Sequence, residues 1–480
     1  MKIAFLQETV NQNIGIMYLS AVLKSKGHHC DLFVESLEKD FIGAVKAYQP
    51  DIVGFSIITG GHLWALNIAG CLKKLLPKTL TVFGGHHPMY FPEIVQQPQV
   101  DAIARGESEV SFPELINRLE RGDNYSDILG FWVKKDGKIH QNDVAPLIDD
   151  ISSLPHPDHQ LYLKYIFYRD QSEVPFSITR GCPFRCAFCY NQVKAELYRD
   201  KGKYLRTRNV EDIISEMDMA LKIYPKMNSV ILYEGIGWAG RKWLSDFTLV
   251  YRERVGLSWI TSIRADFVDE FMVEELAKSN CSCLALGVET GDEVIREKIL
   301  GKRIPNSQYV LAARLLHKAG IKVRTSNMFF LPQEDINKAF KTVDLNREMK
   351  ADFTSAYTLQ PYPGTDIYDY AVKNGFLSAM FKFDDIDPLC MMKPIIELRD
   401  KSKIIVLHRL FHYAVRNSFM RRLLDVLISV PPNPLFDLLY YFSLILGYAQ
   451  YHRISLLRAI CIAWNNYRCA KKNMITAGGS

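Results

Sequence analysis

The chain has 480 residues, of which 48% are hydrophobic and 23% are charged. This balance is typical of globular proteins and excludes a largely disordered chain, and the length corresponds to about three domains of roughly 150 residues. The formal net charge is only +6, so nucleic-acid binding is not expected. The first six residues are too short an apolar run for a signal peptide, and ten cysteines form no disulfide scaffold, so we expect a protein of the reducing cytoplasm.

Strands and helices are expected to alternate over the first 145 residues. Apolar runs indicate five strands, at residues 3–6, 29–34, 51–57, 80–83 and 101–104. Helical periodicity lies between them, at residues 14–25, 41–48, 62–76 and 111–121. Asp136-Gly137 then marks a hairpin turn within residues 131–139. This alternation predicts a doubly wound, Rossmann-like parallel sheet, whose ligands bind beyond the carboxyl ends of the strands.

Glycine and small polar residues gather near the predicted strand ends of this sheet. The candidates for ligand contact are Gly15, Ser56, Gly60, Gly84, Gly85, His86 and Glu107. Glycines at strand ends let a large ligand approach the backbone. No G-x-G-x-x-G opens the first helix, which argues against a dinucleotide. For His86, an ordinary loop hydrogen bond is the simpler interpretation, and ligation of a metal is the alternative.

A polar stretch punctuated by prolines follows, and residues 146–172 are predicted to be a linker. It contains His156 and His159. Solvated or helix-capping histidines are the simpler interpretation. A position over a cleft between domains is the alternative.

Six βα units are expected over residues 173–375. The predicted strands lie at residues 174–178, 229–233, 258–263, 283–288, 323–330 and 355–359. This repetition predicts a partial (β/α)6 barrel. The strand ends of such a barrel form one open face, where barrel active sites lie.

The loop after the first barrel strand carries three cysteines spaced C-x3-C-x2-C, namely Cys182, Cys186 and Cys189. Three thiolates in one loop can hold an iron–sulfur cluster, although a 4Fe–4S cluster usually takes four. The next cysteine is Cys281, so one iron would stay open for a substrate or cofactor. A structural zinc site, which usually needs a second ligand pair, and three unrelated thiols are the alternatives.

With Phe188 before the last cysteine, this motif resembles the signature of radical S-adenosylmethionine (SAM) enzymes. The phrases G-V-E-T-G at residues 287–291 and Y-P-G-T at residues 362–365 are similar to further motifs of that family. The resemblance implies that the open iron chelates the amino and carboxylate groups of SAM. It also implies that the cluster, reduced by a ferredoxin or flavodoxin, cleaves SAM to methionine and a deoxyadenosyl radical.

The same resemblance implies SAM contacts in the cysteine loop and at the ends of the second, third and fourth barrel strands. The candidates are Phe188, Glu234, Ser262, Arg264 and Glu289. A carboxylate can accept hydrogen bonds from SAM, and Arg264 can pair with the SAM carboxylate. The sequence departs from the family at Tyr233-Glu234-Gly235, where related enzymes often carry Gly-Gly-Glu or paired acids. An ordinary structural salt bridge is the alternative for each charged residue.

The order of the two units resembles the cobalamin-dependent radical SAM enzymes, in which a B12-binding domain, here residues 1–145, precedes the core. The phrases G-G-H-H-P at residues 84–88 and Gly106-Glu107 are similar to those of that group. The resemblance implies that the seven strand-end candidates named above contact cobalamin. Many cobalamin proteins ligate cobalt through D-x-H-x-x-G. With Gly15 at the last position, Val10 and Gln12 replace the aspartate and histidine. An empty or degenerate domain is the alternative.

Residues 376–475 are expected to form a C-terminal helical region, with apolar periodicity at residues 401–419, 423–430 and 435–448. The last run carries Asp437 and is shorter than the about 20 apolar residues that a membrane span requires. Helices packed over the barrel mouth are one interpretation. A peripheral membrane contact, which would suit a lipid-like substrate, is the other.

Together these resemblances imply an enzyme with a 4Fe–4S cluster, SAM and cobalamin, which methylates an unactivated carbon of an unknown small molecule. Cyclisation, ring contraction or oxidative rearrangement with the same cofactors is one alternative. A non-catalytic cobalamin or metal sensor is the alternative of another class. Nothing in the sequence identifies the substrate.

Overall fold

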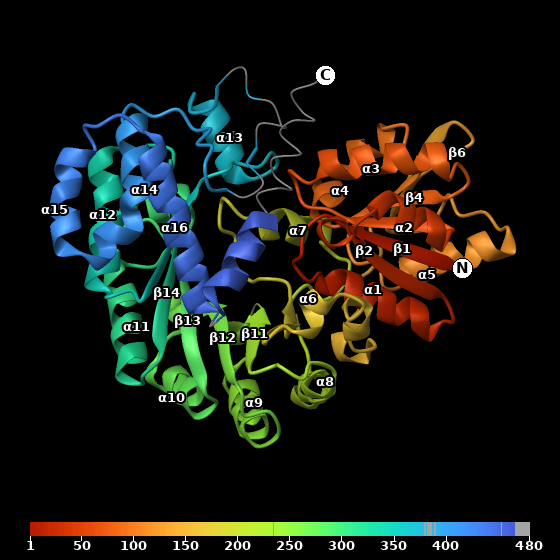
Figure 1. The fold of residues 1–480 in the computed structure, drawn as a ribbon, viewed down its shortest axis with the longest axis horizontal. Coiled ribbons are helices and arrows are strands. Elements are labelled where there is room, and N and C mark those ends of the chain that lie inside the picture. The colour runs from red at the N-terminus through yellow and green to blue at the C-terminus, as the bar shows by residue number, and fades with distance from the viewer. Residues whose placement is uncertain (234, 379–380, 382–385, 388–389, 453, 466–480) are drawn as a thin grey trace.

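The computed structural model describes residues 1–233, 235–378, 381, 386–387, 390–452 and 454–465. An N-terminal sheet with helices on both faces occupies one side of the molecule (Figure 1). A second sheet, drawn in green, occupies the other side and has its helices outside it. The C-terminal helices, drawn in blue, lie against this second unit.

In the described part of the chain the N-terminal sheet has seven strands, in the order β2-β1-β3-β4-β5-β6-β7. They are β1 (Lys2–Gln7), β2 (His29–Val34), β3 (Ile52–Ser56), β4 (Leu80–Gly84), β5 (Ala102–Ala104), β6 (Phe131–Lys135) and β7 (Lys138–Gln141). The first five pair in parallel, and β6 and β7 add an antiparallel hairpin. The doubly wound parallel sheet and the hairpin turn are thus confirmed.

Helices cover both faces of this sheet because side chains alternate along its strands. In β1, Ile3 and Phe5 pack into one apolar cluster, whereas Ala4 and Leu6 pack into another. The first cluster includes side chains of α1 (Ile14–Ser25) and α5 (Ser111–Arg121), and the second includes side chains of α2 (Phe41–Tyr48) and α3 (His62–Leu75).

The loop that was expected after β4 contains a short helix, α4 (His86–Tyr90). Gly85 precedes it with φ of 91°, a conformation that glycine adopts readily. This turn lets the His87 N–H donate to the Ile57 carbonyl at 2.9 Å. Pro88 then lies in the first helical turn, where a missing N–H costs no intrahelical bond.

The second sheet has six parallel strands within the described residues, in the order β15-β14-β13-β12-β11-β8. They are β8 (Glu173–Ser177), β11 (Ser229–Tyr233), β12 (Ser258–Ile263), β13 (Cys281–Glu289), β14 (Lys322–Phe329) and β15 (Phe353–Thr358). The helices between them are α8 (Val210–Ile223), α9 (Arg241–Arg254), α10 (Glu270–Lys278), α11 (Asn306–Lys318) and α12 (Ile336–Glu348). The partial (β/α)6 barrel is confirmed.

Four helices follow the barrel, namely α13 (Asp366–Lys373), α14 (Lys401–Arg416), α15 (Ser418–Leu427) and α16 (Pro434–Tyr451). The sequence predicts a continuous helix over residues 401–419, but α14 ends at Arg416 and a new helix begins after Asn417. The Asn417 side chain accepts from the N–H groups of Phe419 and Met420 at 2.8 and 3.2 Å, which caps α15.

Helix α16 packs against the strands of the barrel. Its Tyr440 hydroxyl donates to the Ala356 carbonyl of β15 at 2.7 Å. Its last residue, Tyr451, packs with Ile260 and Cys283 of the barrel strands. The helix therefore runs from the edge strand of the barrel towards its interior. In the part of the chain that the structure describes, no helix is long and apolar enough to cross a membrane.

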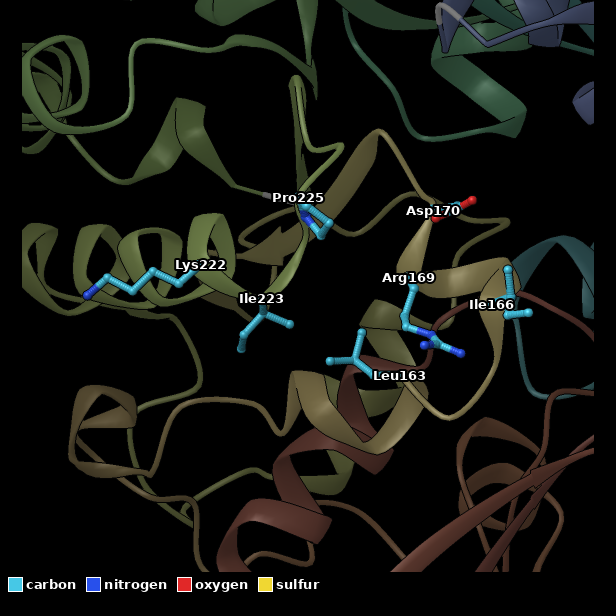
Figure 2. Close-up of a pocket in the computed structure, with 7 residues that line it drawn as sticks. All are labelled: Leu163, Ile166, Arg169, Asp170, Lys222, Ile223 and Pro225. Carbon is cyan, nitrogen blue, oxygen red and sulfur yellow. The ribbon is translucent and has the colours of Figure 1, made fainter.

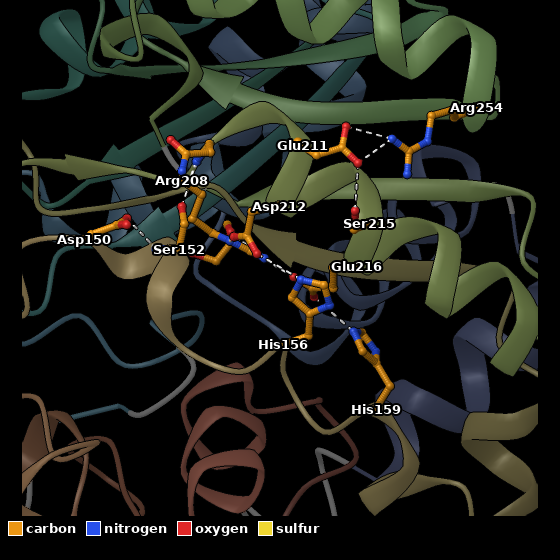
Figure 3. Close-up of polar contacts among 12 residues, drawn as sticks. Asp150, Ser152, His156, His159, Arg208, Glu211, Asp212, Ser215, Glu216 and Arg254 are labelled. Atoms are coloured by element: carbon orange, nitrogen blue, oxygen red, sulfur yellow. Dashed lines mark hydrogen bonds and ion pairs between the residues drawn. The ribbon is translucent and has the colours of Figure 1, made fainter. Parts of the chain in front are cut away.

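A buried polar network ties the linker to α8 (Figure 3). The Glu216 carboxylate lies 3.0 Å from His159 Nε2 and accepts from the Arg208 guanidinium. Arg208 also donates to Asp212, which lies 2.9 Å from His156 Nε2. Burial alone would raise the pKa of Glu216, but the bonds from His159 and Arg208 lower it. Both linker histidines are thus paired with carboxylates of α8 and fix the linker in place.

Replacing Glu216→Gln is expected to destabilise the protein by about 3 kcal/mol, the low end of the range for a broken buried ion pair, because the buried Arg208 loses Glu216 but keeps Asp212. Glu211→Gln is the matched control, since Glu211 pairs with Arg254 on the exposed side of the same helix (Figure 3). Thermal unfolding of both variants at neutral pH checks this expectation. An equal change in melting temperature would contradict it.

The Glu216 effect should also depend on pH. Because the pKa of Glu216 is lowered in the folded protein, its stabilisation is fully present above the unfolded pKa of about 4.3. It is lost as the pH falls through the lower folded pKa. The difference between wild type and Glu216→Gln should therefore shrink in acid.

Candidate functional site

The three motif cysteines lie in the loop between β9 (Thr179–Arg180) and α7 (Asn191–Leu197). The Cys189 N–H donates to the Cys186 carbonyl at 3.0 Å, which closes a turn within the motif. Ala187 anchors the loop to the barrel. Its N–H donates to the Leu300 carbonyl at 2.9 Å, and its carbonyl accepts from the Ile367 N–H at 3.0 Å.

The three motif cysteines are partly buried. Burial raises the pKa of Cys189, and the neighbouring thiols of Cys186 and Cys182 add to that rise. No three His, Cys, Asp or Glu side chains among the described residues converge on one metal ion. Three thiolates in one loop are the kind of ligand that an iron–sulfur cluster takes.

Two predicted SAM residues lie beside Cys186. Burial raises the pKa of the Cys186 thiol, the nearby cations of Lys302 and Arg264 oppose the rise, and the Glu289 carboxylate adds to it. Arg264 follows β12, and its guanidinium lies 3.6 Å from the centre of the Phe184 ring within the cysteine motif. It pairs with Asp266 at 2.7 Å. Arg264 and Glu289 therefore lie at the same end of the barrel as the cysteine loop.

Glu289 is held in an unusual backbone conformation. Its φ is 66°, and the register between β13 and β14 shifts at Gly287 and Glu289. Such bulges re-aim side chains next to active sites. The buried Glu289 carboxylate pairs with Lys302 Nζ at 2.9 Å. A Cβ at Gly287 would lie 2.4 Å from the Glu289 carboxylate and 3.0 Å from Lys302 Nζ, so this pair needs glycine there.

Three residues that support this turn were missed by sequence reasoning, namely Lys302, Arg296 and Tyr309. Arg296 is fully buried and donates to the carbonyls of Thr290 and Ile304. The Tyr309 hydroxyl donates to the Gly287 carbonyl at 2.9 Å. Arg296 is buried because residues 295–299 form one π-helical turn, which no local pattern distinguishes from an exposed helix.

The remaining SAM candidates within the described residues have no polar side-chain contact with the cysteine motif that would fix their position. Ser262 is exposed on β12, two residues before Arg264. Phe188 is half-buried and packs against an apolar cluster that includes barrel residues such as Phe329. Glu234 lies outside the described residues.

The predicted ligand edge of the N-terminal sheet lies beside the cysteine loop. His86 is exposed at the start of α4, with its ring 6.3 Å from that of Tyr90. Tyr90 in turn stacks on Tyr190, the residue after Cys189, with ring centres 3.9 Å apart and planes within 9°. The carboxyl ends of both sheets therefore meet at this point.

The other strand-end candidates line the same edge. A Cβ at Gly85 would lie 2.7 Å from the Ile57 nitrogen, so the backbone turns there without room for a side chain. The Ser56 hydroxyl accepts from the Asn13 side chain at 3.0 Å, and Asn13 also caps α1. Gly60 has φ of 96°, and Gly15 lies in the first turn of α1. Glu107 is bound to Arg180 and Arg206.

A pocket opens where the N-terminal unit, the barrel and the C-terminal region meet. Gln12, Ile231, Tyr233, Tyr448 and Ile462 are among its lining residues. Tyr233 is 46% exposed and Tyr448 is 37% exposed. Burial nevertheless raises the pKa of both, that of Tyr448 to about 12.

Another pocket, of about 480 Å³, lies between the linker and the end of α8 (Figure 2). Its lining residues are Leu163, Ile166, Arg169, Asp170, Lys222, Ile223 and Pro225. None of these belongs to the cysteine loop or to the SAM and cobalamin candidates. This pocket is therefore not part of the candidate site.

Comparison with known proteins identifies both units. The family model for the B12 binding domain matches residues 8–116, and that for the radical SAM superfamily matches residues 176–345. An uncharacterised methyltransferase of Pyrococcus horikoshii is 27% identical over 80% of this chain and 84% of its own length. The anaerobic magnesium-protoporphyrin IX monomethyl ester cyclase of Rubrivivax gelatinosus is 24% identical over 79% of this chain and 69% of its own length.

Solved structures share the fold. The cobalamin-dependent SAM radical enzyme OxsB aligns with a TM-score of 0.69 at 14% identity, over 99% of this chain and 80% of that chain. The radical SAM methyltransferase TsrM of Kitasatospora setae aligns with a TM-score of 0.64 at 15% identity, over 82% of this chain and 80% of that chain. With its cysteine loop, its B12-binding edge and both matching domains, this chain belongs to the cobalamin-dependent radical SAM enzymes.

Proposed function

We propose that this enzyme methylates an unactivated carbon of a small molecule, using SAM, a 4Fe–4S cluster and cobalamin. The contact between the two cofactor edges carries the proposal. Tyr90 of the B12-binding domain stacks on Tyr190, directly after Cys189. One cavity can therefore serve both cofactors, as methyl transfer to a substrate radical requires. The division into residues 1–145, 146–172, 173–375 and 376–475 is part of the same proposal.

Cys182, Cys186 and Cys189 are the proposed cluster ligands, and the fourth iron is left for SAM. When bound, the reduced cluster supplies the electron that cleaves SAM, and cobalamin supplies the methyl group. The chain orients and shields these groups. Burial of the cysteine loop, and its bonds through Ala187, limit its movement during turnover.

Glu289, Arg264, Ser262, Phe188 and Glu234 are the proposed SAM contacts. The Glu289 carboxylate is oriented by Lys302 at 2.9 Å and can accept from the SAM ammonium or ribose hydroxyls. The Arg264 guanidinium keeps further N–H donors for the SAM carboxylate while it pairs with Asp266. Its position over the Phe184 ring fixes it next to the cysteine motif.

The cobalamin contacts are proposed along the edge that faces this loop. They are Gly15, Ser56, Gly60, Gly84, Gly85 and His86. The glycine backbone turns there admit a large ring system. Glu107 is left out of this set because both of its oxygens accept from arginines.

The substrate is proposed to bind in the recess lined by Tyr233 and Tyr448. Its lining is mixed, with aromatic and aliphatic side chains such as Ile231 beside polar ones such as Gln12 and Glu173, which suits a small molecule that has both an apolar body and polar groups. A ferredoxin or flavodoxin is the proposed electron donor, and the cytoplasm the proposed location. Cyclisation or rearrangement is the second candidate, because relatives include a cyclase of Rubrivivax gelatinosus.

Anaerobic reconstitution with iron, sulfide and cobalamin, followed by SAM and a reductant, tests the reaction class. Deoxyadenosine is expected from the wild type. It should be lost in Cys186→Ala, because the two cysteines that remain are too few to hold the cluster. S-adenosylhomocysteine formed alongside it, with a competent substrate, supports methyl transfer. Deoxyadenosine without S-adenosylhomocysteine favours cyclisation or rearrangement. A wild type that binds cobalamin but forms neither product would contradict catalysis and favour a sensor.

Gly287→Ala is expected to weaken SAM binding by roughly tenfold, about 1.4 kcal/mol, because its Cβ displaces the Glu289 carboxylate. Calorimetric titration of the reconstituted protein with SAM measures the affinity. Gly70→Ala is the control, since a Cβ there meets nothing within 4 Å. Unchanged SAM affinity in Gly287→Ala would remove Glu289 from the proposed contacts.

A peripheral membrane contact is proposed for the consecutive helices α15 and α16. Val426, Leu435, Leu438 and Phe442 are each at least half exposed on it. Apolar side chains on exposed helices can enter the headgroup layer of a bilayer. Such a contact would bring the recess beside α16 close to lipid-like substrates.

Flotation with liposomes tests this contact. The wild type is expected to float with the vesicles, and the double variant Leu435→Ser with Leu438→Ser should float less. Leu249→Ser is the matched control, because Leu249 is equally exposed but lies on α9. A wild type that stays entirely in the lower fraction would contradict the membrane contact.

A further inference from the structure

Glu107 lies between two arginines where the B12-binding domain meets the radical SAM core. Its carboxylate accepts from Arg206 at 2.5 and 2.9 Å and from Arg180 Nη1 at 3.0 Å. The second Arg180 nitrogen donates to Glu109 at 2.6 Å. Arg206 is 2% exposed, Glu107 10% and Arg180 16%. The network is therefore almost completely removed from water.

The two arginines need this carboxylate. Arg180 and Arg206 are direct cross-strand partners in the ribbon formed by β9 and β10 (Arg206–Thr207). Like charges opposite one another destabilise a strand pair. Burial alone would raise the pKa of Glu107, but its bond to Arg206 and the charge of Arg180 lower it, so the carboxylate is held in its charged form.

The same segment also holds the other flank of the cysteine loop. The Glu107 N–H donates to the Tyr198 hydroxyl at 2.6 Å, and Tyr198 follows the end of α7. Gly106 has φ of 93°, and a Cβ there would lie 1.9 Å from the Tyr198 hydroxyl. Arg180 precedes Cys182 by two residues, whereas Tyr198 lies beyond Cys189. The turn at Gly106 and Glu107 of the B12-binding domain thus contacts the chain on both sides of the cluster motif.

We propose that Glu107 is a positioning residue that fixes the cysteine loop against the B12-binding domain. Through Arg180, Arg206 and Tyr198 it sets the separation between the cluster and cobalamin. This inference rests on the proposed function, because it assumes that both groups bind at their proposed sites. Glu107 acts through the chain and needs no contact with either group.

The experiment uses the full-length protein reconstituted with cluster and cobalamin and reduced with dithionite. Iron and cobalamin contents are measured first. The microwave power that saturates the cob(II)alamin EPR signal is then measured, since a nearby paramagnetic cluster speeds its relaxation in a strongly distance-dependent way. The variants are E107Q and E107D. E114Q is the matched control, because Glu114 makes an exposed pair with Arg118 in the same domain.

E107Q is expected to keep both cofactors but to shift the saturation power, whereas E114Q matches the wild type. If E107Q loses its cofactors, E107D decides, because it keeps the charge with a shorter side chain and should bind both cofactors with a smaller shift. Wild-type saturation in a variant that holds both cofactors overturns the inference, as does loss of both cofactors from E107Q and E107D alike. A wild type that binds only one cofactor overturns the proposed function, and this inference with it.

Discussion

The position of the cysteine loop is the constraint on which the rest of the structure depends. A cluster that reacts with SAM beside cobalamin needs its ligand loop at the carboxyl ends of two different sheets. The barrel and the following helix α13 hold the loop through the two backbone groups of Ala187, which bond to Leu300 and Ile367. The B12-binding domain holds it through the stack of Tyr90 on Tyr190 and through the pairing of Glu107 with Arg180. Each sheet thus places its own ligand edge against the same short segment.

Much of this arrangement could be predicted from local sequence. Continuous apolar runs predicted the strands of both sheets, because successive residues such as Ile3 and Ala4 pack on opposite, buried faces. The spacing of the three cysteines and the G-V-E-T-G phrase located the site at one end of the barrel. The resemblance also predicted Arg264 and Glu289 as SAM contacts, and both lie near Cys186 because parallel strand ends meet at one edge.

The supporting residues could not be predicted, because their partners are distant in sequence or their burial depends on tertiary packing. Glu107 contacts arginines 73 and 99 residues away. Arg296 and Lys302 resemble exposed cations in the sequence, but Arg296 is buried within a π-helical turn and Lys302 is buried in its pair with Glu289. The path of α16 towards the barrel interior follows from the Tyr440 bond to the edge strand, which no helical periodicity reveals.

The three cysteines are proposed to hold a cluster with one iron left free for SAM. EPR spectroscopy of the reduced, reconstituted protein with and without SAM tests this assignment most directly. If Cys182, Cys186 and Cys189 hold a 4Fe–4S cluster with one iron free, SAM binds that iron and changes the spectrum. The change should be lost in Glu289→Gln at SAM concentrations that saturate the wild type. A cluster whose spectrum is indifferent to SAM, or a cluster that survives replacement of all three cysteines, would contradict the assignment.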